Sequence, residues 1–380
     1  MITLIHHARL ISPDLDIAEG SLRIVEGKID EVIEGTPSNM DADRVIDAGG
    51  RMLMPGFFDI HAHGADRADV CDDSLDALHH IAGCKRREGV TTWLPTTLTQ
   101  PRKKLSSIAA TVATFIAEND LVRCPGMHVE GPFINAEKAG AQNPQFVRPP
   151  DWEEIAALHE IAPVSVLSLA PDVPGAIDLI RRANEAGITC SAAHTASSYT
   201  QIIEAKAAGL RHLTHYGNAM TPLHHREIGV VGAGLLDDSL RVEFIGDTIH
   251  LCPDMLRLMF QCISIDRLML ITDSMAASWI DHGEVMLGGL EVTVKEGTAR
   301  LKDGGALAGS ALRFNHGLKH LVETTGLPLD QLVKTTSWNQ ARSLGLDGFG
   351  RLEPGYHADL VALDDDFSVW QSWLAGRAAE

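Results

Sequence analysis

Two histidines, His61 and His63, stand two residues apart at the end of an apolar stretch that begins at Pro55. In a β-strand, residues two apart place their side chains on the same side, so both imidazoles would face one way. Neutral imidazole is the commonest metal-binding side chain in proteins. The pair therefore predicts half of a metal site. An ordinary surface pair of histidines is the alternative unless further ligands follow downstream.

Further candidate ligands do follow. Each of four later polar residues comes directly after an apolar run and precedes a loop: Glu130, His194, His215 and Asp273. Glu130, His194 and His215 supply one carboxylate and two imidazoles, a set that leaves a position open for water, as in catalytic metal sites. Zn²⁺ suits these ligands, and Fe²⁺ and other divalent ions fit the same set. Asp273 is the candidate general base, which would take a proton from the attacking water.

The elements that must position these residues alternate regularly through the middle of the chain. Eight strands are expected at residues 57–63, 91–97, 127–130, 164–170, 188–194, 211–215, 241–246 and 268–272. Helices are expected between most of them, at residues 74–88, 102–118, 152–161, 175–186, 199–208 and 253–263. Eight β/α repeats over roughly 250 residues indicate a TIM barrel, whose chemistry sits at the C-terminal strand ends. A doubly wound open sheet is the alternative, but the first βα turn lacks the GxGxxG motif.

The two ends of the chain read differently from its middle. Short β-like runs at residues 2–5, 20–25 and 28–33 are separated by glycine and proline, and residues 358–363 repeat the pattern near the C-terminus. We therefore expect an α/β protein with a small β domain built from both termini. Residues 1–53 and 345–380 would form that domain, and residues 54–344 the catalytic barrel.

Composition narrows the class of protein. A net charge of −19 over 380 residues argues against nucleic acid or an anionic membrane as the main partner. A local arginine or helix N-terminus can still bind a small anionic substrate. The six cysteines show no CxxC spacing, which is typical of reduced, mostly buried thiols in a cytoplasmic protein. Neither a signal peptide nor a membrane-spanning run is expected.

Several motifs spread over nearly the whole length point to one family. They lie at residues 128–133 (HVEGPF), 218–220 (NAM), 222–227 (PLHHRE), 272–275 (TDSM), 307–310 (LAGS) and 358–361 (ADLV). Together with the His61–His63 pair, these motifs resemble the N-acetylglucosamine-6-phosphate deacetylase family of the amidohydrolase superfamily. The resemblance implies a TIM barrel of amidohydrolase type with a small β-sandwich domain. It also implies metal-dependent removal of the acetyl group from N-acetylglucosamine 6-phosphate in amino-sugar catabolism.

The resemblance also assigns roles to residues. Glu130, His194 and His215 hold the first metal, and His61 and His63 decide whether a second metal joins it, so one or two Zn²⁺ or Fe²⁺ ions are expected per subunit. Asp273 serves as the base, and His250 contacts the substrate carbonyl and stabilises the developing oxyanion.

Substrate contacts are implied at the mouth of the barrel. Arg226 binds the sugar phosphate, often from the neighbouring subunit, so a homodimer is expected. Further contacts are implied at Ala141, Gln142, Asn218, Ala219, Leu307, Ala308 and Gly309. Gln142 stands where the family usually has a histidine, and it can donate and accept a hydrogen bond but cannot become cationic.

Two alternatives to this function stay open. The same reaction on N-acetylgalactosamine 6-phosphate, or on a related phosphorylated N-acyl amino sugar, would suit altered contacts at the barrel mouth. A catalytically silent sensor of amino-sugar phosphates is the non-enzymatic alternative, although every metal ligand and the base are present. The pairs His6–His7 and His79–His80 are read as ordinary residues of the β domain and of a helix.

Overall fold

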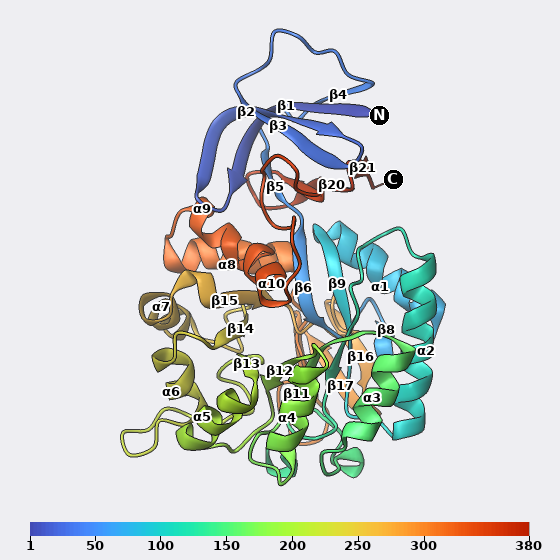
Figure 1. Cartoon of the computed structure of the whole chain (residues 1–380), viewed down its shortest axis with the longest axis vertical. Coiled ribbons are helices and arrows are strands. Elements are labelled where there is room, and N and C mark those ends of the chain that lie inside the picture. The colour runs from blue at the N-terminus through green and yellow to red at the C-terminus, as the bar shows by residue number, and fades with distance from the viewer. Residues whose placement is uncertain (380) are drawn as a thin grey trace.

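The computed structural model describes residues 1–379, and its centre is a closed barrel of parallel strands (Figure 1). Its eight strands neighbour one another in sequence order. They are β6 (Phe57–Ala62), β9 (Val90–Thr97), β10 (Met127–Glu130), β11 (Val164–Leu169), β12 (Thr189–Ala192), β13 (Leu210–Leu213), β14 (Arg241–Ile245) and β15 (Leu268–Ile271). A bridge between Ala62 and Ser274 closes the ring beyond the ends of β6 and β15. The predicted TIM barrel is confirmed.

Most of the helices surround the barrel and cover its outer wall, and the last two lie at the end of the barrel nearer the two chain termini (Figure 1). The helices are α1 (Leu75–Arg87), α2 (Arg102–Glu118), α3 (Trp152–Ile161), α4 (Ala176–Glu185), α5 (Tyr199–Ala208), α6 (Gly229–Leu236), α7 (Pro253–Cys262), α8 (Phe314–Thr325), α9 (Leu329–Leu332) and α10 (Trp338–Ser343). Local sequence explains where several begin. The Ser74 hydroxyl accepts from the Ala77 amide and caps α1, while Ser198 and Gln201 form a capping box at α5.

A second sheet joins both ends of the chain. Its strands run in the order β21-β20-β19-β5-β1-β2-β3, with β4 paired to β1. The N-terminal strands are β1 (Ile2–Ser12), β2 (Leu15–Val25), β3 (Lys28–Glu34), β4 (Arg44–Asp47) and β5 (Met52–Pro55), and the C-terminal ones are β19 (Leu360–Leu363), β20 (Val369–Leu374) and β21 (Arg377–Ala378). Because β5 lies between β1 and β19 and leads directly into β6, this sheet anchors the strand that carries His61. The division of the chain into domains at residues 1–53, 54–344 and 345–380 remains a prediction.

A third sheet was not expected from the sequence. Strands β16 (His282–Leu287), β17 (Leu290–Lys295) and β18 (Thr298–Leu301) form an antiparallel meander between β15 and α8. Its buried side chains, Val285, Leu287, Val292 and Val294, pack with Met275 and Ala308 at the barrel mouth.

Two short strands, β7 (Gly64–Ala65) and β8 (Ala68–Asp69), form a turn after His63. Within residues 1–379, the helices are too short or too polar to cross a membrane.

Candidate active site and metal centre

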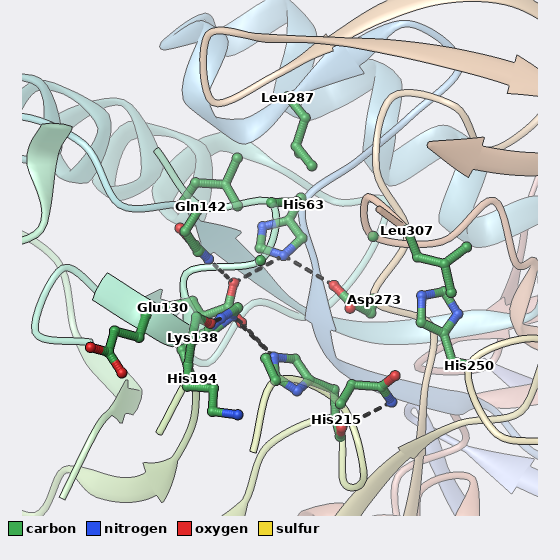
Figure 2. A pocket seen from close by; sticks show the side chains of 17 residues that line it. His63, Glu130, Lys138, Gln142, His194, His215, His250, Asp273, Leu287 and Leu307 are labelled. Carbon is green, nitrogen blue, oxygen red and sulfur yellow. Dashed lines mark hydrogen bonds and ion pairs between the residues drawn. The ribbon is translucent and has the colours of Figure 1, made fainter. Parts of the chain in front are cut away.

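A cavity of about 310 Å³ opens at the C-terminal ends of the barrel strands (Figure 2). His63, Glu130, His194, His215 and Asp273 line it together, although they come from strands spread over more than half of the chain. The cavity also receives most of the substrate contacts implied by the resemblance: Ala141, Gln142, Asn218, Ala219, His250, Leu307 and Gly309. The predicted convergence at one face of the barrel is therefore what the structure shows.

One group of ligands lies on the side of β10, β12 and β13. Glu130 ends β10, and His194 and His215 follow β12 and β13 by two residues each. The Glu130 Oε1 atom lies 3.3 Å from His194 Nε2 and 3.1 Å from His215 Nε2. All three side chains are buried. Their donor atoms point at one common position, as a catalytic metal site with a carboxylate and two imidazoles requires.

A second group lies across the cavity on the side of β6 and β15. His61 Nε2 is 3.4 Å from Asp273 Oδ1, and His63 Nε2 is 3.2 Å from the same oxygen. Glu130 stands between the two groups, because its Oε2 atom is 3.4 Å from His63 Nε2 while Oε1 faces His194 and His215. This carboxylate is placed to serve both groups at once.

The hydrogen bonds of the imidazoles test whether these residues fit a metal. His194 Nδ1 donates to the Lys138 carbonyl at 2.8 Å, and His63 Nδ1 donates to the Thr96 carbonyl at 3.1 Å. A neutral imidazole with its proton on Nδ1 has a lone pair on Nε2, which is the form that binds metals. The Nε2 atoms of His194 and His215 lie only 3.2 Å apart. A divalent cation held between these two nitrogens and Glu130 Oε1 would fit this buried arrangement.

The ionisation states of Glu130 and Asp273 suit metal binding and proton transfer. Burial by itself would raise the pKa of Glu130, but the neighbouring His61, His194 and His215 outweigh it and hold that pKa well below its ordinary value. The same balance applies to Asp273, whose pKa is lowered because His61 and His63 outweigh its burial. Both groups are therefore carboxylates near neutral pH, the state that a metal ligand or a general base needs.

Backbone geometry aims the ligands at the cavity. His194, His215 and Asp273 have φ angles of 44°, 31° and 50°, in the left-handed region that side-chain-bearing residues seldom adopt. Each stands where a strand gives way to a loop. Such conformations cost free energy and are typical of functional sites, where the surrounding structure holds them in place.

Gln142 lies in the cavity wall but points toward the metal ligands. Its Nε2 atom donates to Glu130 Oε2 at 2.6 Å, and its Oε1 atom accepts from the Thr99 amide at 2.6 Å. The side chain is only 2% exposed. The amide therefore holds the Glu130 carboxylate in orientation, a role that the sequence reading of Gln142 as a sugar contact did not foresee.

Two further residues that hold the site in place, Glu243 and Lys85, were missed from the sequence. Glu243, in the middle of β14, accepts from His61 Nδ1 at 3.4 Å and from His212 Nδ1 at 3.3 Å. The buried Lys85 ammonium contacts Asp59 Oδ2 at 3.1 Å and Ser274 Oγ at 2.8 Å. It therefore links α1 to β6 and to the residue that directly follows Asp273. A single charged residue inside an apolar strand, as in RVEFI, was the available signal for Glu243.

His250 stands on the loop after β14 and lines the cavity. Its Nδ1 atom is 2.6 Å from Asp247 Oδ2. Burial lowers the pKa of His250, but the hydrogen bond and charge of Asp247 outweigh it, so that pKa is raised above its ordinary value. With Nδ1 donating to Asp247, His250 carries a second proton, on Nε2, only as the imidazolium. The raised pKa favours that donor form.

At the outer end of the cavity, two of the predicted substrate-binding residues do not line the wall. Arg226 is exposed on the loop before α6, does not line the cavity of its own chain, and contacts His225 Nε2 at 2.9 Å. Ala308 is buried behind the wall rather than in it. Lys138, which the sequence reading left without a role, does line the cavity (Figure 2). The predicted phosphate contact is thus outside the pocket that the metal ligands share.

Comparison with known proteins agrees with this architecture. The model of the amidohydrolase family matches residues 52–378. An N-acetylglucosamine-6-phosphate deacetylase of Bacillus subtilis is 35% identical over 99% of this chain and 96% of its own. An N-acetylgalactosamine-6-phosphate deacetylase of Escherichia coli O157:H7 is 37% identical over the full length of both.

A solved structure is similar over the same extent. A mutant N-acetyl-D-glucosamine-6-phosphate deacetylase of Mycobacterium smegmatis, in complex with N-acetyl-D-glucosamine 6-phosphate, superposes with a TM-score of 0.93 at 30% identity and covers 99% of each chain. The chain belongs to the amidohydrolase family and, within it, to the family of N-acetylglucosamine-6-phosphate deacetylases.

Proposed function

We propose that this protein hydrolyses the acetamide of N-acetyl-D-glucosamine 6-phosphate to give D-glucosamine 6-phosphate and acetate, in amino-sugar catabolism. The observation that carries the proposal is the meeting of Glu130, His194, His215 and Asp273 in one buried cavity of a full-length member of this family. A sensor would need the binding cavity alone, and not an ionised carboxylate held beside a metal-ligand set.

Glu130, His194 and His215 would hold the indispensable divalent metal, Zn²⁺ or Fe²⁺. His61 and His63 would hold a second, with Glu130 shared between the two sites. When bound, such a metal supplies Lewis acidity and lowers the pKa of water to about 7. Gln142 and Glu243 would keep Glu130 and His61 in orientation, as hydrogen-bond partners of metal ligands do in other proteins.

Asp273 and His250 would act on the substrate from two sides. The Asp273 carboxylate accepts a proton from the attacking water and then delivers it to the departing amine nitrogen. His250 donates from Nε2 to the carbonyl oxygen, where negative charge develops as water adds. The hydrogen bond from its Nδ1 to Asp247 fixes the ring, so the donor is oriented before the substrate arrives.

Arg226 would bind the phosphate in the cavity of a second subunit, which makes a homodimer part of the proposal. Its exposure and its absence from the lining of its own cavity support that assignment, because an exposed guanidinium on a loop is available to a neighbour. Asn218, Ala219, Ala141 and residues 307–309 would complete the sugar and phosphate contacts. The six free cysteines suit a reducing compartment, so we place the protein in the cytoplasm.

N-acetylgalactosamine 6-phosphate is the second candidate substrate. The E. coli relative that carries this name is 37% identical over both full lengths. Gln142, whose amide is engaged by Glu130 and Thr99, leaves recognition of the sugar hydroxyls to other groups of the cavity.

The test is acetate release from three compounds by metal-loaded protein: N-acetylglucosamine 6-phosphate, its galacto epimer and unphosphorylated N-acetylglucosamine. We expect the highest kcat/KM for the first and the lowest for the third. A clear preference for the galacto epimer would replace the first proposal with the second. No acetate from any of them, with metal bound, would leave the sensor as the remaining function.

A further inference from the structure

A third group of metal-binding side chains lies outside the cavity, on the outer face of α1. We propose that Asp66, His80 and Cys84 bind a divalent transition-metal ion such as Zn²⁺ at this place. The His80 Nε2 atom lies 3.1 Å from Asp66 Oδ2 and 3.9 Å from Cys84 Sγ. Among residues 1–379, only this group and the two ligand groups of the cavity bring three such donors within 4.8 Å of one another.

Local structure holds the three donors together. His80 and Cys84 are four residues apart on α1, so their side chains lie on the same face, one turn from each other. Asp66 reaches that face from the turn between β7 and β8, where its amide donates to the Ser278 carbonyl at 2.8 Å. Its φ of 46° turns the backbone into the left-handed region. The carboxylate is thus supplied by a turn that the rest of the fold holds in place.

The geometry favours metal binding over a nucleophilic triad. In a Cys-His-Asp triad, the thiol and the carboxylate contact different ring nitrogens. Here both contact Nε2 of His80, so the three donor atoms face one shared point. One nitrogen, one sulfur and one oxygen, with a fourth position left to water, form a tetrahedral set that suits Zn²⁺.

The surroundings of Cys84 are consistent with a sulfur ligand. The thiol is buried, and its Sγ atom accepts from Arg87 Nη2 at 3.1 Å. Burial raises the pKa of the Cys84 thiol above its ordinary value, and the hydrogen bond from the guanidinium opposes that rise in part, so the metal itself must displace the thiol proton. Binding would release the thiol proton to solvent, and the two negative ligands would balance the charge of the ion. Asp66 and His80 are each about half exposed, so an ion could reach the site from solvent.

The site is separate from the catalytic ligands but shares their backbone. Asp66 follows His63 by three residues, and its partner Ser278 follows Asp273 by five. An ion at this place would link α1 to the turn between β7 and β8, which is hydrogen-bonded through the Asp66 amide to Ser278. Its expected contribution is therefore to the rigidity of the segments that carry His63 and Asp273, while the catalytic groups themselves remain those of the cavity.

Sulfur gives the experiment its specificity, because the two ligand groups of the cavity contain only nitrogen and oxygen donors. Metal-free full-length protein is titrated with Co²⁺, and the near-ultraviolet absorption is followed for a thiolate-to-cobalt charge-transfer band. We expect the band in the native chain, its loss in Cys84→Ser, and one Co²⁺ fewer per chain in that variant. Cys262→Ser, which changes an exposed cysteine on α7, is the matched control and should keep the band.

A second variant separates loss of metal binding from loss of the native fold. His80 is exposed, so His80→Ala should leave the circular dichroism spectrum unchanged while it weakens Co²⁺ binding at this site at least tenfold. Absence of the band in the native chain at saturating Co²⁺ would overturn the proposal. So would a band that survives in Cys84→Ser, or Co²⁺ affinity that is unchanged in a folded His80→Ala variant.

Discussion

The two ends of the cavity are built in different ways. At the inner end, Glu130, His194 and His215 are buried, and side chains or carbonyls of the same chain hold two of them in orientation. At the outer end, Arg226 is exposed on a loop and stands apart from the cavity of its own chain. Under the proposed function, one chain supplies the chemistry by itself, whereas recognition of the phosphate would use Arg226 of a second subunit. Substitutions at the two ends should therefore change different kinetic constants.

The largest effect is expected at Asp273. In Asp273→Asn the metal ligands Glu130, His194 and His215 remain, but the group that moves the proton is lost. We expect kcat to fall by about 10²–10⁴-fold with the more tightly held metal retained. Steady-state kinetics and elemental analysis measure the two quantities. Asp281→Asn, an exposed carboxylate on the same segment, is the control and should match the native enzyme; a near-normal kcat in Asp273→Asn would refute the assigned role.

Gln142 tests whether the inner end is held from within the chain. Gln142→Ala removes the amide that orients Glu130, so the metal dissociation constant should rise by about 10–100-fold, as for other partners of metal ligands. Competition with a chelator measures it. The exposed Gln145→Ala is the matched control. If metal affinity stays the same while KM for the sugar rises, Gln142 is a substrate contact after all.

Arg226 tests the outer end. Arg226→Ala should raise KM for the phosphorylated sugar by roughly tenfold or more, because a charge-assisted hydrogen bond contributes about 1.5–3 kcal/mol. The unphosphorylated sugar should show no such change, and kcat should stay close to native. An equal effect on both sugars would remove Arg226 from phosphate binding. Mixing Arg226→Ala with Asp273→Asn protein should restore part of the activity if the arginine acts across a dimer.

The smallest effect is expected as a shift in pH dependence. The Asp247 carboxylate raises the pKa of His250, so the Nε2–H donor is present at low pH and is lost only as the pH rises through that raised value. In Asp247→Asn the pKa should fall, and the donor should be lost at lower pH. The basic limb of the kcat profile should therefore move to lower pH, while the acidic limb stays. A basic limb that does not move would mean that His250 does not act as an imidazolium donor.

The sequence predicted the barrel well because its signals are local. Apolar runs that end in a polar residue marked β10 and its neighbours, and α2, α3 and α5 have the predicted bounds. The Gly-rich apolar segment of α6 shows no periodic pattern and was missed. The meander β16–β18 was also missed, although its alternating burial and its Gly288-Gly289 turn are typical of a hairpin.

The sequence predicted which candidate ligands meet in the cavity, and it predicted less well the side chains that contact them. Glu130 ends its strand, and His194, His215 and Asp273 follow theirs by two residues each, so topology alone brings them together. The partners that hold them, such as Gln142 and Lys85, come from a loop and a helix whose contacts depend on tertiary packing. The same reason hid Asp66 beside His80, because no fixed spacing links a turn to the face of a helix.

A structure of Asp273→Asn with metal and N-acetylglucosamine 6-phosphate would test the division of the cavity most directly. We predict the acetyl carbonyl beside His250 and the ligand group of Glu130, His194 and His215, and the phosphate beside Arg226 of a second subunit. A phosphate bound by Lys138 within the same chain, with Arg226 of every subunit left in solvent, would contradict the account.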